Sequence, residues 1–333
     1  MQSTWSRILS EITTQSKLNP AAIDTVRREK ITAIELITAR PLIVYATAWT
    51  TPGRNVPQDL LQIDFSDKTG FRDVTEQLTG ENLDILIHSP GGLAEATQGI
   101  VDGLRERFSS IRFIVPHAAK SAATMLALSG NVILMDEVSE LGPIDPQMPI
   151  FQGGGVKYSP ADAILGQFED ASKDIQEHPE KLSIWVPLLA QMGPSLLVEC
   201  ANAKLLSRTL VKEWLTKYMF KGEVDAADNA ERISSYLADH KNFLSHSKRV
   251  SMTELVNLHC KVEDLRNAPN LRNAVWELYC AIDITMANST ACKIIENSSG
   301  HAVIRAQQVQ QMFMPNPFGI QASLPAGLPT FPI

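Results

Sequence analysis

Two segments of the sequence have the residue types of a reactive centre. Gly91 and Gly92 follow the apolar residues 83–89. Glycine has no Cβ, so their backbone N–H groups can approach a ligand closely and stabilise an oxyanion. Ser121 precedes Ala122 at a second junction of the same kind. It fits an accessible nucleophile, with the Ala122 N–H as another oxyanion donor, and it also fits a simple helix N-cap.

The elements around these residues alternate between strand and helix. Residues 83–89 and 111–116 are short apolar runs typical of buried parallel strands. Between them, apolar residues at 93, 96, 100 and 104 have helical spacing. A helix over 121–129 and a strand over 131–135 repeat the alternation, and residues 40–49 add a strand rich in β-branched side chains. We therefore predict an α/β fold with a parallel sheet.

The chain divides into four parts by composition. Residues 1–39 read as a helical segment, 40–150 as the α/β core, 151–306 as a helical extension that completes the core and its interfaces, and 307–333 as an irregular Pro-rich tail. The glycines at 153–155 predict a flexible loop. Apolar periodicity predicts these helices: 73–78, 160–172, 182–191, 196–218, 225–239, 253–258 and 271–286.

Three motifs carry a family resemblance. LDILIHSPGG, VPHAAKSAATMLALSG and SELGPIDPQ occur in this order between Leu83 and Gln147. They resemble the Clp/crotonase superfold of serine peptidases, and more closely the serine dehydrogenase proteinase family, which is related to signal peptide peptidase A and the Clp proteolytic subunit. The resemblance implies a Clp/crotonase-like core of repeated β-β-α and βαβ units. It also implies that Ser121 is the nucleophile.

The resemblance leaves the proton acceptor open. Clp-type relatives place a histidine about where this chain has Asp145. An aspartate with a pKa of about 3.9 is a poor base for a serine, so Asp145 needs burial or a cationic or imidazole partner. Signal-peptide-peptidase relatives use a lysine from further along, which points to Lys157. A lysine acts as a base only if its surroundings lower its pKa, and the competing interpretation of Lys157 is a solvated side chain.

Three other side chains compete for the role of base. His117 matches a histidine associated with the family pattern, although it also fits a structural histidine near the cleft. Lys120 immediately precedes Ser121 and is expected to point elsewhere. His246 fits a core or surface position better than a catalytic one, and the spacing of His240 and His246 puts them off a shared helix face. We predict no metal site and no cofactor.

Composition excludes several classes of protein. The formal net charge is −7, with 44% hydrophobic and 20% charged residues, which is typical of a globular chain and argues against a nucleic-acid surface. Polar residues interrupt the longest apolar stretch, 113–135, so we expect no membrane span. The N-terminus lacks the pattern of a secretory signal. Four separated cysteines favour reduced thiols, and hence a cytoplasmic location.

The favoured hypothesis is a serine endopeptidase that forms a Ser121 acyl-enzyme, with Gly91, Gly92 and Ala122 as oxyanion donors. The backbone beside Gly92 and Leu93 would pair with an extended peptide or protein substrate. One alternative is a crotonase-like acyl-CoA enzyme, and another is a catalytically silent peptide-binding scaffold of the same fold. The resemblance also implies a homo-oligomer.

Overall fold

A seven-stranded sheet forms the centre of the computed structural model, which describes residues 2–152, 155–190 and 193–307. Its strand order is β10-β5-β3-β2-β1-β11-β12. The first five are mutually parallel, whereas β11 and β12 run antiparallel to their neighbours. The fold is therefore mixed α/β with a mostly parallel sheet, as predicted. The bounds are β1 Leu42–Thr47, β2 Asn82–His88, β3 Ser110–Val115, β5 Val132–Met135, β10 Val262–Asp264, β11 Ala291–Asn297 and β12 Ala302–Ala306.

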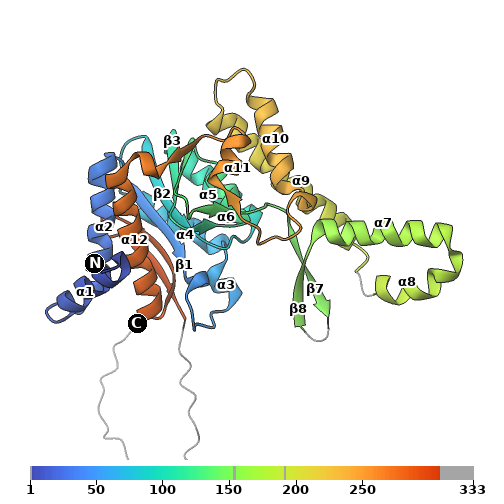
Figure 1. Cartoon of the computed structure of the whole chain (residues 1–333), viewed down its shortest axis with the longest axis horizontal. Coiled ribbons are helices and arrows are strands. Elements are labelled where there is room, and N and C mark those ends of the chain that lie inside the picture. The colour runs from blue at the N-terminus through green and yellow to red at the C-terminus, as the bar shows by residue number, and fades with distance from the viewer. Residues whose placement is uncertain (1, 153–154, 191–192, 308–333) are drawn as a thin grey trace, which may run out of the picture.

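Helices cover both faces of this sheet (Figure 1), because the strands have apolar side chains on both faces. In β2, Ile85 and Ile87 pack into one hydrophobic cluster while Leu86 packs into another, so both faces need an apolar cover. The first cluster includes residues of α4, α5 and α6, and the second includes residues of α2 and α12. Helix α1 packs on α12. The bounds are α1 Thr4–Ser16, α2 Ala22–Thr38, α4 Phe65–Thr75, α5 Ala94–Arg105, α6 Ala122–Leu128 and α12 Pro269–Asn288.

The segment after the core extends away from the sheet as an arm. It consists of a β-hairpin and two helices that project to one side in Figure 1 before the chain returns to the core. Helix α8 buries none of its residues, although its sequence is almost entirely apolar. The bounds are β7 Gln147–Gln152, β8 Gly155–Pro160, α7 Ala161–Glu177, α8 Leu182–Leu189, α9 Leu196–Trp214 and α10 Ala226–Ala238.

Short elements complete the described chain. The strands β4, β6 and β9 form a separate three-stranded sheet. A parallel bridge between Ser89, just after β2, and Ala119, in β4, connects it to the carboxyl end of the main sheet. The bounds are β4 Ala118–Ala119, β6 Glu140–Leu141, β9 Val250–Ser251, α3 Gln58–Leu61, α11 Met252–Asn257, a π-helical turn at Leu215–Met219, and 3₁₀ turns at Ala48–Thr50, Pro179–Lys181, His240–Asn242 and Leu265–Asn267.

A buried ion pair ties β11 to α4. Lys293 Nζ lies 2.9 Å from both carboxylate oxygens of Asp67 and donates to the Gln62 carbonyl at 2.7 Å. The Tyr45 hydroxyl donates to the same carboxylate at 2.8 Å. Burial raises the pKa of Asp67, while the Lys293 charge opposes that shift. This network holds the first turn of α4 in place. Ile63 lies just before that helix and is hydrogen-bonded to the segment of the glycine pair, so the network also helps to position that segment.

The structure differs from the predictions in local ways. The helix expected at 73–78 begins at Phe65 and ends at Thr75. Of the glycines predicted to form a loop, Gly153 and Gly154 lie outside the described residues, and Gly155 begins β8, so Lys157 stands on a strand instead of in a loop. The predicted N-terminal helix is two helices, α1 and α2. Of the predicted irregular tail, only Gln307 lies within the described residues.

Candidate active site

The serine segment is attached to the end of β2 by backbone hydrogen bonds. Ser89 N–H donates to the Ala118 carbonyl at 3.2 Å, and Lys120 N–H donates to the Ser89 carbonyl at 3.0 Å. These bonds form because β2 and β3 are parallel neighbours, so the chain leaving each strand emerges at the same edge of the sheet. As a result, Ser121 lies beside the loop that contains the glycine pair.

Gly91 packs directly against the serine. A Cβ at Gly91 would lie 2.6 Å from the Lys120 carbonyl oxygen and the Ser121 Cβ, and 2.8 Å from the Ala122 nitrogen. The φ of Gly91 is +101°, which also favours glycine. A Cβ at Gly92 would lie 2.3 Å from backbone atoms of Ile63. Both positions therefore require glycine, and Gly91 is the one that lies against Ser121.

Ser121 has an unusual backbone conformation. Its φ is +51° and its ψ is −123°, in a region that non-glycine residues rarely occupy. Ser121 is the residue before α6, yet its side chain makes no capping hydrogen bond, and its Oγ has no hydrogen-bond partner in the described chain. The residue is partly exposed. The simple N-cap interpretation is therefore not supported, because the hydroxyl caps no backbone N–H of α6.

Two backbone amides beside Ser121 are free. Gly92 N–H and Ala122 N–H have no acceptor within the described residues, because Ile63 binds Gly91 and Leu93 instead and Ala122 is the first residue of α6. The Gly91 N–H, in contrast, donates to Ser89 Oγ at 3.2 Å. Of the three expected oxyanion donors, Gly92 and Ala122 are therefore the available pair in this conformation.

Asp145 is the centre of a polar cluster. It is 1% exposed and accepts hydrogen bonds from both His240 Nδ1, at 2.9 Å, and His246 Nδ1, at 2.7 Å. Gln147 Nε2 donates to it at 3.0 Å. A histidine that donates Nδ1–H to a carboxylate keeps Nε2 as a proton acceptor. The buried aspartate thus has the imidazole partners that the sequence argument required.

Strand pairing connects this cluster to the end of the core where α6 begins. Ala119 and Leu141 pair in the parallel β4–β6 ladder, and Gly142 N–H donates to Thr124 Oγ1, in α6, at 2.9 Å. Asp145 follows Gly142 by three residues, a separation that spans at most about 10 Å of chain. The Asp145 cluster and the start of α6 therefore occupy the same end of the core.

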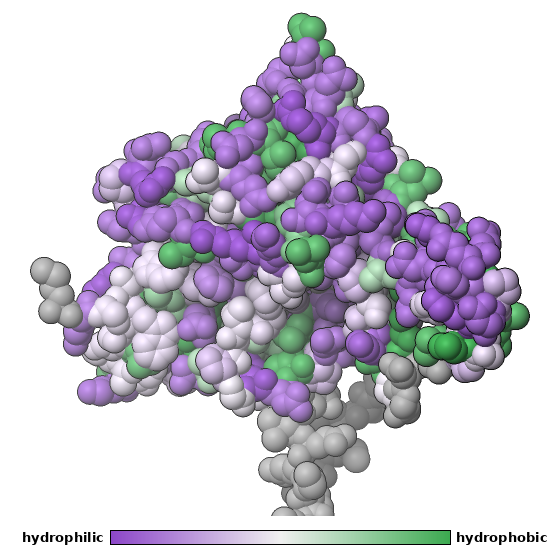
Figure 2. Space-filling view, turned by 45° about the vertical axis from the view of Figure 1, so that its right-hand side comes forward, coloured by the Kyte–Doolittle hydropathy of each residue, from purple (hydrophilic) through white to green (hydrophobic). Residues whose placement is uncertain are grey.

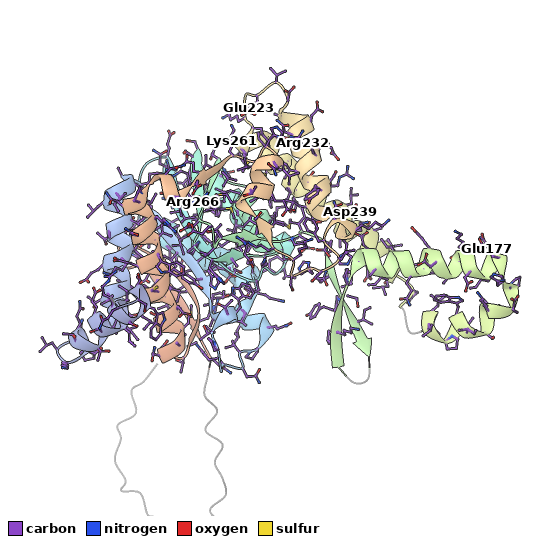
Figure 3. All side chains as sticks on the ribbon, in the orientation of Figure 1. Glu177, Glu223, Arg232, Asp239, Lys261 and Arg266 are labelled. Carbon is purple, nitrogen blue, oxygen red and sulfur yellow. The ribbon has the colours of Figure 1, made fainter. Side chains whose placement is uncertain are left out.

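His240 is the residue that the sequence argument missed. The sequence argument assumed that His240 and His246 belong to one α-helix, whose spacing would place them on different faces. In the structure both histidines follow α10 and lie outside an α-helix, and both donate a hydrogen bond to Asp145. The end of α10 lies near the root of α7, as the label of Asp239 in Figure 3 shows, and His240 N–H donates to Asp162 of α7 at 3.3 Å. Two histidines in a short non-helical segment are the only sequence signal.

The two lysine candidates lie in different surroundings. Lys120 is 7% exposed, and its Nζ donates to the Leu141 carbonyl at 3.0 Å and pairs with Glu140 at 2.7 Å. It is therefore engaged with β6, as expected. Lys157 is exposed on β8, where it pairs with Ile150 in the hairpin register. In this conformation Lys157 has the solvated surroundings of the competing interpretation.

His117 contacts α12. Its ring stacks on Tyr279 with 5.6 Å between centroids and meets His88 edge-on at 5.4 Å. Its Nδ1 is buried and has no hydrogen-bond partner among the described residues. Burial, together with the neighbouring His117, lowers the pKa of His88 to about 3. The structure thus places His117 in an aromatic cluster on α12 and shows no hydrogen bond between it and Ser121.

The described residues contain no group of histidine, cysteine and acidic side chains that could hold a metal ion. Among the helices of residues 2–152, 155–190 and 193–307, none is both long enough and apolar enough to span a bilayer.

Comparisons with known proteins find one matching family and several similar proteins. Residues 58–165 match the family described as ClpP-like SDH-type serine proteinase, which confirms the resemblance found in the sequence. Two uncharacterized proteins of Methanocaldococcus jannaschii are similar: one is 46% identical over 66 residues, 20% of this chain and 23% of the relative, and the other 40% identical over 74 residues, 22% and 25%. The aligned part of the chain thus spans about a quarter of each relative.

Solved structures of a membrane-bound stomatin-specific protease, 1510-N, are also similar. One alanine variant aligns over 69% of this chain and 82% of its own, with 16% identity and a TM-score of 0.38. A second, in complex with a substrate peptide, aligns over 63% and 74%, with 18% identity and a TM-score of 0.38.

Proposed function

We propose that this chain, whose residues 58–165 match the ClpP-like SDH-type serine proteinases, is a serine endopeptidase with Ser121 as its nucleophile. The observation that carries the proposal is the contact between Gly91 and a partly exposed Ser121 in a strained backbone conformation. Ser121 Oγ attacks the peptide carbonyl, and the bond to the leaving amine breaks to give an acyl-enzyme. Water then hydrolyses the ester and regenerates the serine.

The free amides of Gly92 and Ala122 stabilise the oxyanion in this mechanism. Ala122 follows Ser121 directly, Gly92 follows the Gly91 that contacts Ser121, and neither amide has an internal acceptor in the described chain. Such preorganised donors need no rearrangement when charge develops on the carbonyl oxygen, and removal of one donor typically costs about 10²–10³ in rate. The Gly91 N–H could act as a third oxyanion donor only if it gave up its hydrogen bond to Ser89 Oγ.

The Asp145 cluster supplies the base. One of the two imidazoles accepts the Ser121 proton at Nε2 and then returns it to the leaving amine, while Asp145 holds Nδ1–H and stabilises the cation. Asp145 therefore orients the base and does not itself take the proton. The rival base is Lys157. For Lys157 to take the proton, its exposed side chain on β8 would have to come within hydrogen-bond distance of Ser121.

Substrate would bind along the free edge of the glycine segment. Ile63 occupies one edge, since its N–H donates to Gly91 and its carbonyl accepts from Leu93. The Gly92 N–H points to the other edge. An extended peptide that pairs there brings its scissile carbonyl next to Ser121, which supports a peptide or protein substrate.

Labelling with a fluorophosphonate tests the proposal. Ser121→Ala should abolish labelling, whereas Ser183→Ala, an exposed serine on α8, should leave it unchanged. His240→Gln and His246→Gln, measured separately, identify the imidazole that acts as base, because loss of the base should lower the rate by about 10²–10⁴. Undiminished labelling of Ser121→Ala would overturn the nucleophile assignment.

Lys157→Ala separates the two proposed bases. The Asp145 assignment predicts normal labelling of Lys157→Ala and a large loss in at least one of the two histidine variants. The opposite pattern would assign the base to Lys157 and remove Asp145 from the mechanism.

The structure gives little support to the two alternative functions. An acyl-CoA enzyme needs cations for the phosphates, but Lys120, the cation next to Ser121 in sequence, is already paired with Glu140. The silent scaffold was suggested by the lack of a histidine at position 145, and the two imidazoles on Asp145 remove that reason.

We also propose a homo-oligomer in which copies meet through the arm. Helix α8 exposes Leu182, Ile184, Val186 and Leu188 at 47–64%, and Figure 2 shows hydrophobic residues below the hydrophilic end of the arm. Apolar patches of this kind commonly mark interfaces. Ile184→Asp should reduce the mass measured by light scattering, and an unchanged mass would contradict this use of the arm.

A cytoplasmic location is part of the same proposal. All four cysteines are free and buried, as expected for structural thiols in a reducing compartment. Cell fractionation tests this location directly, and recovery of the protein outside the cytoplasmic fraction would contradict it.

A further inference from the structure

A cavity of about 440 Å³ lies between α1, α12 and the segments that follow β1 and β3. This volume is within the usual range for small-molecule sites. Helix α12 contributes Trp276, Tyr279 and Asp283, which share one face of the helix because they stand three and four residues apart. Helix α1 contributes Trp5. The lining therefore combines several aromatic rings with one acidic side chain.

The aromatic side chains of this cavity have surface that a ligand can contact. Trp5 is 39% exposed and Trp276 is 37% exposed. The Trp276 and Tyr279 rings lie 5.4 Å apart, centroid to centroid, and Tyr279 stacks in turn on His117 at 5.6 Å. These three rings therefore form a continuous aromatic wall, and both tryptophans leave part of their surface free.

Asp283 gives the cavity a negative charge. Its carboxylate accepts a hydrogen bond from Trp5 Nε1 at 2.9 Å and forms no ion pair among the described residues. Arg7, the cation nearest to Trp5 in sequence, pairs with Glu277 at 2.6 Å instead. Burial raises the pKa of Tyr279 to about 12, and the charge of Asp283 adds to that shift. The described residues that line the cavity include no lysine or arginine, so its charge favours a cation.

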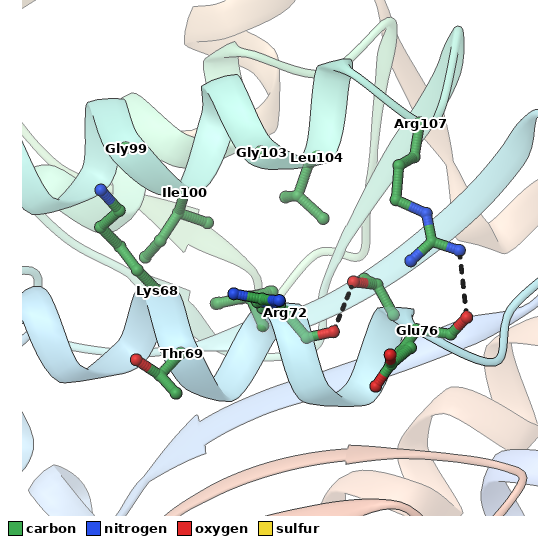
Figure 4. Close-up of a pocket in the computed structure, with 11 residues that line it drawn as sticks. Lys68, Thr69, Arg72, Glu76, Gly99, Ile100, Gly103, Leu104 and Arg107 are labelled. Atoms are coloured by element: carbon green, nitrogen blue, oxygen red, sulfur yellow. Dashed lines mark hydrogen bonds between the residues drawn. The ribbon is translucent and has the colours of Figure 1, made fainter.

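Two other places in the chain lack this combination. In the groove between α4 and α5, the exposed Glu76 lines the same surface as Arg72, so charges of both signs are present (Figure 4). On the arm, Trp185 Nε1 also donates to a carboxylate, that of Asp174, at 2.9 Å. There, however, Lys181 pairs with Asp174 at 2.6 Å and neutralises it. The cavity between α1 and α12 differs from both, because exposed aromatic surface lies beside a carboxylate without a cation.

The polar groups of the cavity favour a cation that has no N–H donors. The Ser3 hydroxyl is hydrogen-bonded to that of Ser6 at 2.9 Å, and the Thr50 hydroxyl to His88 Nε2 at 3.0 Å. A primary ammonium has three donors and loses their water on entry, so it needs several free acceptors. A quaternary ammonium has no donors, and aromatic faces together with one carboxylate stabilise it.

We propose that this cavity binds a small quaternary ammonium ion such as choline. The methyl groups of the ion contact Trp5 and Trp276, and its charge faces Asp283. Tryptophan attracts cations more strongly than the other aromatic side chains do. The inference does not depend on peptidase activity, since none of these three residues is in the proposed catalytic machinery.

Calorimetric titration of the full chain with choline at low salt tests this site. We expect saturable binding of one choline per chain. Dimethylbutanol, the uncharged carbon isostere of choline, should bind at least about 10-fold more weakly, because it lacks the charge that the aromatic faces and the carboxylate attract. Ethanolamine, the primary ammonium counterpart, should bind at least about 5-fold more weakly, because its N–H donors lose water without gaining enough acceptors.

Two pairs of variants test the residues that form the site. Trp276→Leu should weaken choline binding at least about 5-fold, whereas Trp185→Leu, on the arm, should leave it unchanged. Asp283→Asn keeps an acceptor for Trp5 Nε1 and removes only the charge, and it should also weaken binding at least about 5-fold. Asp174→Asn, at the carboxylate that Lys181 neutralises, should bind choline normally. Asp283→Asn changes almost no volume, so it tests the site even if Trp276→Leu does not fold.

Three results would overturn the proposal. The first is the absence of saturable choline binding. The second is an affinity for dimethylbutanol or for ethanolamine equal to that for choline, which would show that the cavity does not select a quaternary cation. The third is choline binding that Asp283→Asn leaves unchanged.

Discussion

Replacement of Gly91 by alanine tests the contact on which the active site depends. The new Cβ would lie 2.6 Å from the Ser121 Cβ, whereas ordinary contact begins at 3.4 Å, so the serine or the loop must move by about 0.8 Å. A displacement near 1 Å at a reacting group can cost about 10²-fold in rate. We therefore expect the fluorophosphonate labelling rate of Gly91→Ala to fall by about two orders of magnitude.

Gly80→Ala is the matched control for this variant. Gly80 also has a positive φ, +86°, but a Cβ there would meet nothing within 4 Å. Both substitutions therefore carry a backbone strain of about 1–3 kcal/mol, and only Gly91→Ala displaces the serine. Labelling rates and thermal midpoints should be measured together. Equal labelling rates in the two variants would refute the argument that Gly91 positions Ser121.

Two further predictions concern stability. His88, with its pKa lowered to about 3 by burial, resists protonation in the folded state, so stability should fall by up to about 1.4 kcal/mol per pH unit from pH 6.5 towards pH 3. Urea unfolding of His88→Gln should show a shallower pH dependence in that window, and an identical profile would contradict the assignment. Lys293→Met leaves the buried Asp67 carboxylate unpaired and should cost about 3–5 kcal/mol, whereas Lys217→Met, at an exposed ion pair, should leave stability nearly unchanged. Similar urea midpoints for the two lysine variants would contradict that difference.

The parallel core could be predicted because its signals are local. Each of β2, β3 and β5 is a short apolar run, and the residues that follow each run no longer show the hydrophobic pattern of a buried strand. The glycine pair after β2 also has a local cause, since both positions exclude a Cβ. Sequence reasoning therefore identified these strands and the glycine pair that follows β2.

Long-range pairing could not be predicted in the same way. Strand β11 lies beside β1, although nearly the whole length of the described chain separates them. The buried Lys293–Asp67 pair joins β11 to α4, and nothing in the sequence near β11 identifies β1 as its neighbouring strand. The pairing of β7 with β8 was missed because the run of glycines before Lys157 suggested a loop.

The candidate active site likewise combines features that could be predicted from the sequence with features that could not. Ser121 was predicted from its position at a strand-to-helix junction and from the family motifs. Its backbone strain and the free amides of Gly92 and Ala122 depend on the folded loop. His240 was missed because helical spacing does not govern a segment that lies outside a regular helix.

A crystal structure of the fluorophosphonate adduct would test the central claim most directly. The account predicts phosphorus bonded to Ser121 Oγ, with one phosphoryl oxygen about 2.7–3.1 Å from the nitrogens of Gly92 and Ala122. An adduct on another residue, or a phosphoryl oxygen directed away from both amides, would contradict it.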